Sequence, residues 1–148
     1  MCQFGAVLRF FCIKFGYYNT KDWKAARYAD PIVDTWADFV GAAGAVLFAP
    51  DSEKAALTEK VVAVGKKFNM IVEKNLSHHK GKWAAGNNIG IADFVMAAYI
   101  GNFGMNPESP FAPQLKADYD ETPLFKQYAM NIMQEFTYLK SRGSVGPF

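Results

Sequence analysis

The segment from 88 to 100 constrains the fold most, because a helix-start signal leads directly into an apolar stretch. Asp93 lies three residues after Gly90, the spacing at which an acidic side chain can accept a hydrogen bond from the free N–H groups that begin a helix. Ile89 and Phe94 stand at the positions of a hydrophobic staple. The residues that follow are apolar on every side. The segment therefore predicts a buried helix, with structural capping by Ile89, Asp93 and Phe94.

The rest of the chain shows the three- and four-residue spacing of apolar side chains that is typical of amphipathic helices. No alternating pattern indicates a strand, so we predict an all-α fold. The proline-rich segment 105–121 is expected to be mostly loop, with one turn near Gln114. The predicted helices span residues 3–15, 20–47, 51–79, 90–102 and 123–142.

Local signals predict where the first two helices begin and end. Gly16 is expected to terminate the first helix in a left-handed conformation. Thr20 is expected to cap the second helix, with Asp22 in its first turn. Pro31 is expected to kink that helix or to restart it, with Asp30 as the new cap.

Two features of these helices predict how they pack. Arg9 lies among apolar residues of the first helix, so we expect it to pair with an acid at the junction with the next segment. Gly41 and Gly44 stand among alanines in the second helix and would permit close backbone approach. The last helix is expected to end at Arg142 and Gly143.

Composition narrows the class of protein. The chain has 148 residues, 51% hydrophobic and 20% charged, which is the composition of one globular domain, or of one domain and a small fragment. The net charge of +2 is too small to predict a nucleic-acid partner or an anionic membrane surface. The longest apolar run, 39–50, is too short to span a bilayer, so no membrane insertion is expected.

The cysteines and histidines predict neither a disulfide nor a metal site. Cys2 and Cys12 lie about 15 Å apart along one predicted helix, too far for a disulfide, and indicate reduced thiols of an intracellular protein. His78 and His79 are adjacent, so their side chains diverge on a helix. No metal ligands and no required cofactor are therefore assigned.

Three local matches make the chain resemble the glutathione transferase family, most closely its sigma-like (prostaglandin-D-synthase-like) class. Residues 3–18 look like the last helix of that family's thioredoxin-like domain. Residues 30–39 look like the sigma-class dimer-interface helix, and residues 86–94 look like the family's capping box. The resemblance implies a residual thioredoxin-domain helix at 1–18 and the helical C-terminal domain at 19–148.

The resemblance also implies roles for individual residues. Gln3 would contact the γ-glutamyl group of glutathione, and Asp38 would reach the glutathione amine of a dimer partner. Asp30, Asp34 and Asp38 would lie at the dimer interface, and Asp93 would be the structural capping acid. Glutathione is thus a possible ligand. Asp34 and Asp38 also share one helix face, and the simpler interpretation is a solvated or dimer-facing acidic edge rather than a remnant of a glutathione contact.

The chain departs from the family at its catalytic half. The βαβ segment that should precede Gln3 is absent from this sequence, and with it the hydroxyl that activates the thiol, so no catalytic residue is assigned. Phe4 stands where the family has a serine that holds the glutathione carboxylate. Gly90 stands where the family has the capping hydroxyl.

These departures leave two functions open. The first is a non-catalytic binding or scaffold subunit, in which another chain covers the apolar side chains of the first helix, namely Ala6, Val7, Phe10, Phe11 and Ile13. The second is a piece of an active sigma-like transferase that conjugates glutathione to electrophiles. In that case the second and fourth helices would line the electrophile site, with Trp36, Phe39, Val40 and Met96 as pocket rather than core residues.

Overall fold

The computed structural model describes residues 3–137 and 139, and it confirms the all-α fold. Within these residues no strand forms, and the one isolated β-bridge joins Trp83 to Gly86 in the loop before the fourth helix. The elements are α1 (Phe4–Lys14), α2 (Trp23–Phe48), α3 (Asp51–His79), α4 (Ile91–Tyr99), the π-helical turn η1 (Ile100–Gly104), α5 (Ala112–Ala117), the 3₁₀ turn η2 (Asp118–Asp120) and α6 (Pro123–Glu135).

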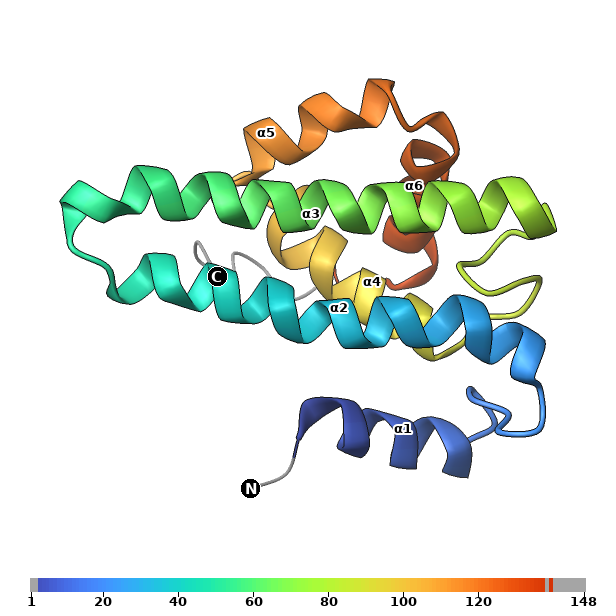
Figure 1. The fold of residues 1–148 in the computed structure, drawn as a ribbon. Coiled ribbons are helices and arrows are strands. Elements are labelled where there is room, and N and C mark those ends of the chain that lie inside the picture. Colours follow the sequence, from blue (N-terminus) through green and yellow to red (C-terminus); the bar gives the residue numbers. More distant parts are fainter. Residues whose placement is uncertain (1–2, 138, 140–148) are drawn as a thin grey trace.

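Two long antiparallel helices form the frame of the molecule. α2 and α3 lie side by side along its length, and α4 crosses behind them (Figure 1). The ring of Tyr99 on α4 lies 5.1 Å from that of Phe39 on α2 and 5.0 Å from that of Phe68 on α3. All three side chains are fully buried. The apolar run after Asp93 is therefore the central helix of the core, as its sequence predicts.

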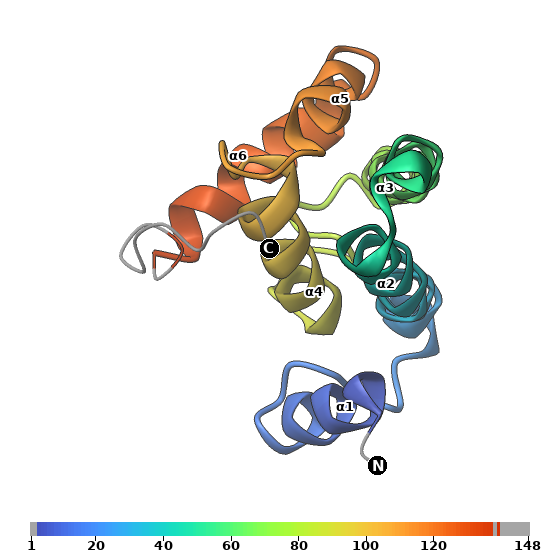
Figure 2. The ribbon, with the colours of Figure 1, turned by 90° about the vertical axis from the view of Figure 1, so that its left-hand side faces the viewer.

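α1 stands apart from this bundle. It lies below α2 and α4, while α5 and α6 lie on the opposite side (Figure 2). Among the helices, α1 packs mainly against α2 and α4. It ends before Gly16, which has a φ of +81° and so takes the left-handed conformation that its sequence predicts.

The predicted start of α2 is wrong by a few residues. Asp22, not Thr20, is the N-cap, and its carboxylate accepts a hydrogen bond from the Ala25 N–H at 3.0 Å. The reason is local: the Asn19 side chain accepts from the Lys21 N–H at 3.0 Å, so the chain is still turning at that point. The helix can begin only once this turn is complete.

Pro31 does not restart α2, and Asp30 is not a cap. The helix is continuous from Trp23 to Phe48 with Pro31 inside it. Asp30 instead accepts hydrogen bonds from side chains of the preceding segment. The ring of Pro31 is exposed, so it removes one backbone hydrogen bond without disturbing the packed face. Packing on α3 and α4 along the rest of the helix holds it together.

The predicted close approach at Gly41 and Gly44 is also wrong. A Cβ added at either position would meet nothing within 4 Å in the described structure. The close approach occurs at Gly65 on α3 instead, where a Cβ would lie 2.9 Å from the Tyr99 hydroxyl and overlap Leu115. The glycine that packing requires is therefore on the neighbouring helix.

The C-terminal part has more helix than its prolines predict. α5 and η2 occupy 112–120, where mostly loop is expected. α6 begins after Thr122 as predicted but ends at Glu135, because Phe136 leaves helical geometry and packs its ring 5.6 Å from that of Phe94. The predicted stop at Arg142 and Gly143 lies outside the described residues.

In the described part of the chain, one helix, α2, is long and apolar enough to cross a membrane by length and composition. Only 33% of its apolar window is buried within the fold. Core helices of bundles pass the same test, and Ile32, Val33 and Phe39 of α2 are buried against other helices. The finding is weak evidence for a membrane span.

Candidate functional site

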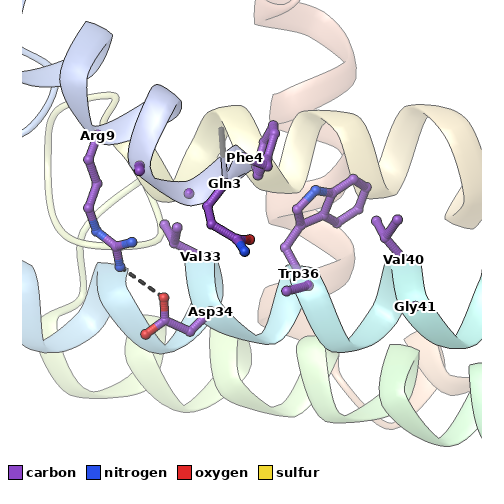
Figure 3. Close-up of a pocket in the computed structure, with 11 residues that line it drawn as sticks. Gln3, Phe4, Arg9, Val33, Asp34, Trp36, Val40 and Gly41 are labelled. Atoms are coloured by element: carbon purple, nitrogen blue, oxygen red, sulfur yellow. Dashed lines mark hydrogen bonds and ion pairs between the residues drawn. The ribbon is translucent and has the colours of Figure 1, made fainter. Parts of the chain in front are cut away.

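A groove of about 970 Å³ lies between α1 and α2. Figure 3 shows its side chains: those of α1 come from one wall and those of α2 from the other. No residue of α4 lines it, so the groove differs from the predicted pocket between the second and fourth helices. The lining residues are Gln3, Phe4, Gly5, Ala6, Arg9, Val33, Asp34, Trp36, Ala37, Val40 and Gly41.

A charged cluster closes one end of the groove. Arg9 donates hydrogen bonds to Asp34 at 2.9 Å and to Asp30 at 3.2 Å, which confirms the predicted pairing at this junction (Figure 3 shows the Asp34 bond). Tyr18 donates to the Asp30 carboxylate at 2.9 Å. The hydrogen bond to Asp34 raises the pKa of Arg9, and burial raises the pKa of the Tyr18 hydroxyl, with Asp30 adding to the effect.

Aromatic rings form the other end. Phe4 lies with its ring 6.2 Å from that of Trp36, and Trp36 stacks at 6.0 Å on the buried ring of Phe39. Phe4 is 50% exposed, so part of its apolar ring remains open to solvent at this end of the groove. Gln3 lies at the start of α1 beside this ring and makes no capping hydrogen bond. This end of the groove offers apolar surface and one amide.

The two residues assigned to glutathione do not meet within the chain. Gln3 lines the groove, whereas Asp38 does not. Asp38 is exposed on α2 and makes no hydrogen bond or ion pair with the described residues. Of the three dimer-interface candidates, Asp30 and Asp34 are engaged by Arg9 within the same chain. Only Asp38 keeps its carboxylate free for another molecule.

The residues weighed between core and pocket divide into two pairs. Phe39 and Met96 are fully buried core residues. Trp36 is half-buried and Val40 is 44% exposed, and both line the groove. The sequence could not separate these pairs, because all four are apolar residues at helical spacing and only the placement of α1 distinguishes them.

Asp93 is held at the entrance of α4 by three donors, two from the preceding loop and one from α6. Its carboxylate accepts from the Gly90 N–H at 2.8 Å, the Ala84 N–H at 3.0 Å and the Tyr128 hydroxyl at 2.7 Å. Burial raises the pKa of this carboxyl, and the three donors oppose that shift. The residue is fully buried and faces no cavity, so its geometry is structural.

The two apolar neighbours of this cap are both half-buried against the core. Phe94 packs its ring 5.0 Å from that of Tyr17, in an edge-to-face arrangement. Ile89 lines a smaller cleft with Tyr17 and Tyr18. The start of α4 is also tied to the segment after α1, because the Ile91 N–H donates to the Tyr17 carbonyl at 3.0 Å.

The buried hydroxyls and the described thiol are not set up as activated groups. Burial raises the pKa values of Tyr99 and Tyr128 far above the ordinary value, and it raises that of Tyr119 as well. Cys12 is 4% exposed, and burial raises the pKa of its thiol. In the part of the chain that the structure describes, no group of three or more histidine, cysteine or acidic residues could hold a metal ion.

Sequence reasoning missed the polar side chains that connect the helices. Asn75 donates to the carbonyls of Tyr28 at 3.1 Å and Ala84 at 3.2 Å, and so joins α2, α3 and the following loop. Asn69 donates to Asp118 at 2.9 Å and accepts from Tyr99 at 3.2 Å. A signal was present: both asparagines interrupt the apolar stripe of α3, where a polar residue needs a buried partner.

Comparison with known families matches residues 37–142 to the family described as Glutathione S-transferase, C-terminal domain. The match covers well over half of the chain, from the middle of α2 through α6. The chain therefore belongs to this family. A search of curated proteins finds none that matches.

Proposed function

We propose that this chain is a non-catalytic binding or scaffold subunit of a larger assembly, in which another protein chain covers α1. The observation that carries the proposal is the outer face of α1. Phe10 and Phe15 are each 62% exposed, and Phe11 and Ile13 are each 48% exposed. Three large apolar side chains on this short helix, and a fourth at its C-cap, form the kind of patch that marks a protein interface.

The chemistry of the neighbouring groups supports a non-catalytic role. A transferase of this family needs a donor that stabilises a thiolate. The Tyr18 hydroxyl is already committed to Asp30, and the Cys12 thiol is buried with a raised pKa. Phe4 places an apolar ring where an anion-binding hydroxyl would be required.

The alternative function is the helical half of an active sigma-like transferase that conjugates glutathione to electrophiles. The groove favours this alternative, because its volume suits a tripeptide and Gln3 lies at one end of it. Gln3 would then contact the γ-glutamyl group of glutathione. Asp38 would contact the amine of the glutathione bound to a dimer partner. Under this alternative a thioredoxin-like half, rather than an unrelated protein, covers α1. For either function we expect an intracellular protein, because the Cys12 thiol is free.

A photo-crosslinking amino acid at Phe10, compared with one at the equally exposed Met70 on α3, tests the covered face. We expect a crosslink to another polypeptide from position 10 and none from position 70. Calorimetric titration with glutathione and a conjugation assay with a model electrophile test the chemistry. We expect neither glutathione binding nor turnover from the purified chain. Measurable turnover, or a crosslink from position 10 to a thioredoxin-like half, would favour the alternative.

A further inference from the structure

A second cleft, of about 460 Å³, lies between the first turns of α2 and the end of α3. It shares no lining residue with the groove between α1 and α2. Its walls include two aromatic rings, two cations and an imidazole, from Trp23, Tyr28, Lys24, Arg27 and His79. Its volume lies within the range of small-molecule sites.

The floor of this cleft is held rigidly by backbone hydrogen bonds. His79 Nδ1 accepts from the Gly81 N–H at 2.9 Å, and the other ring nitrogen lies 3.3 Å from the Ala84 carbonyl. Because Nδ1 is the acceptor, the proton of a neutral imidazole is on Nε2, which donates to that carbonyl. The Tyr28 ring packs edge-on against this imidazole at 5.1 Å. An ordered aromatic floor therefore exists before any ligand binds.

The mouth of the cleft is cationic and aromatic. Trp23 is 68% exposed, with Lys24 Nζ 5.7 Å from its ring centre. The Arg27 guanidinium lies 5.8 Å from the centre of the Tyr28 ring. Neither cation forms an ion pair with the described residues. Asp22 is the one acid in the lining, and its carboxylate already accepts from the Ala25 N–H.

We propose that this cleft binds a flat aromatic ring that carries an anionic group. The ring would stack on the exposed Trp23 and lie against Tyr28, whose own ring packs on the His79 imidazole. The anionic group would take the fork of the Arg27 guanidinium, with Lys24 adding a point charge. A neutral ring would make only the stacking contacts, and an anion without a ring would make only the contacts with the two cations. Both parts of the ligand are therefore needed for tight binding.

Naphthalene-2-sulfonate is a suitable probe, with the neutral 2-naphthalenemethanol as its matched partner. The chain has three tryptophans, and a Trp23→Phe variant assigns the indole N–H signal of Trp23 in a nitrogen–proton NMR spectrum. We expect saturable movement of the Trp23 signal with the sulfonate. The alcohol should bind at least about tenfold more weakly, since it lacks the charge-assisted hydrogen bond to Arg27.

Arg27→Gln tests the anion contact, and Lys14→Gln is the matched control. Lys14 forms the same kind of cation–aromatic pair, 5.6 Å from the Phe15 ring centre, but lies on α1 outside the cleft. We expect Arg27→Gln to weaken sulfonate binding about tenfold and Lys14→Gln to leave it unchanged, both with unaltered thermal unfolding. The proposal is overturned if the Trp23 signal does not move, if Arg27→Gln binds as well as the parent, or if Lys14→Gln weakens binding equally.

Discussion

The Arg9 guanidinium on α1 lies 2.9 Å from the Asp34 carboxylate on α2, across the end of the main groove. The same guanidinium reaches Asp30, one helical turn earlier, at 3.2 Å. Together with the ring contact between Phe4 and Trp36, this pairing docks α1 on α2. It also uses two of the three acids that the family resemblance implies for a dimer interface.

Removing the charge of Asp30 should loosen α1 more than removing that of Asp34. Asp30 accepts from both Arg9 and Tyr18, whereas the Asp34 side chain is 71% exposed. We expect Asp34→Asn to speed amide hydrogen exchange in 4–14 by about twofold, as for an exposed ion pair. Asp30→Asn should speed it by about fivefold or more, because the hydrogen bonds from both donors lose their charged acceptor and become weaker. Asp38→Asn is the control and should leave exchange unchanged; an equal effect there would contradict the docking role.

Asp93→Asn should destabilise the fold by about 1–3 kcal/mol, measured by urea unfolding. The carboxylate accepts from donors on both of its oxygens, and an amide would turn its NH₂ toward one of them. Asp22→Ala removes an exposed cap on α2 and should lose only about 1 kcal/mol. If the two variants lose the same stability, the buried network at Asp93 contributes no more than an ordinary cap.

The pH dependence of this difference follows from the raised pKa of Asp93. A carboxyl whose pKa is higher in the folded state takes up its proton there first, so its contribution to stability grows as the pH falls through the folded pKa toward the unfolded value. The stability gap between the parent and Asp93→Asn should therefore widen on acidification from neutral pH. Paired urea titrations at several pH values measure this gap. A gap that narrows on acidification would contradict a raised pKa for Asp93.

Gly65→Ala should destabilise the protein, whereas Gly41→Ala should stabilise it. A Cβ at Gly65 would overlap Leu115 and lie 2.9 Å from the Tyr99 hydroxyl, which is an overpacking change of about 1–3 kcal/mol. At Gly41 the Cβ would meet nothing, and alanine is the better helix former by about 0.5–1 kcal/mol. Thermal unfolding of the two variants should therefore shift in opposite directions. A loss of stability at Gly41 would mean that another surface packs on α2.

The Cys12 thiol should react slowly with an aromatic disulfide reagent at neutral pH. Its thiolate is disfavoured by burial, which raises its pKa above the ordinary value. In a Cys2→Ser background, the reaction rate should rise only at a pH above the pKa of a free cysteine. In denaturant, the rate should become that of a free cysteine. Cys12 lines a small cleft with Leu8 and Phe94. Rapid labelling of the folded chain at neutral pH would show that this cleft admits the reagent.

Sequence patterns predicted the elements whose signals are local. The cap at Asp93, the left-handed Gly16 and the break before α3 each depend on a few adjacent residues, so spacing alone was sufficient. The start of α2 was less secure, because Thr20 and Asp22 are both good caps and the turn at Asn19 decides between them. The expected apolar surface on the first helix also followed from sequence, since it needed only a count of large side chains on that helix.

Contacts between helices, and the cavities that they leave, could not be predicted in this way. The sequence by itself determined that the chain is all-α, that a capped apolar helix lies at its centre, and that Arg9 requires an acidic partner, because periodicity, capping and charge burial act over one or two helical turns. Only the tertiary structure decided that Asp30 and Asp34 are that partner, that Gly65 rather than Gly41 is the tight contact, and that Trp36 and Val40 line a groove while Phe39 does not. These outcomes depend on which helix faces meet, and that choice is made by packing between residues far apart in the chain.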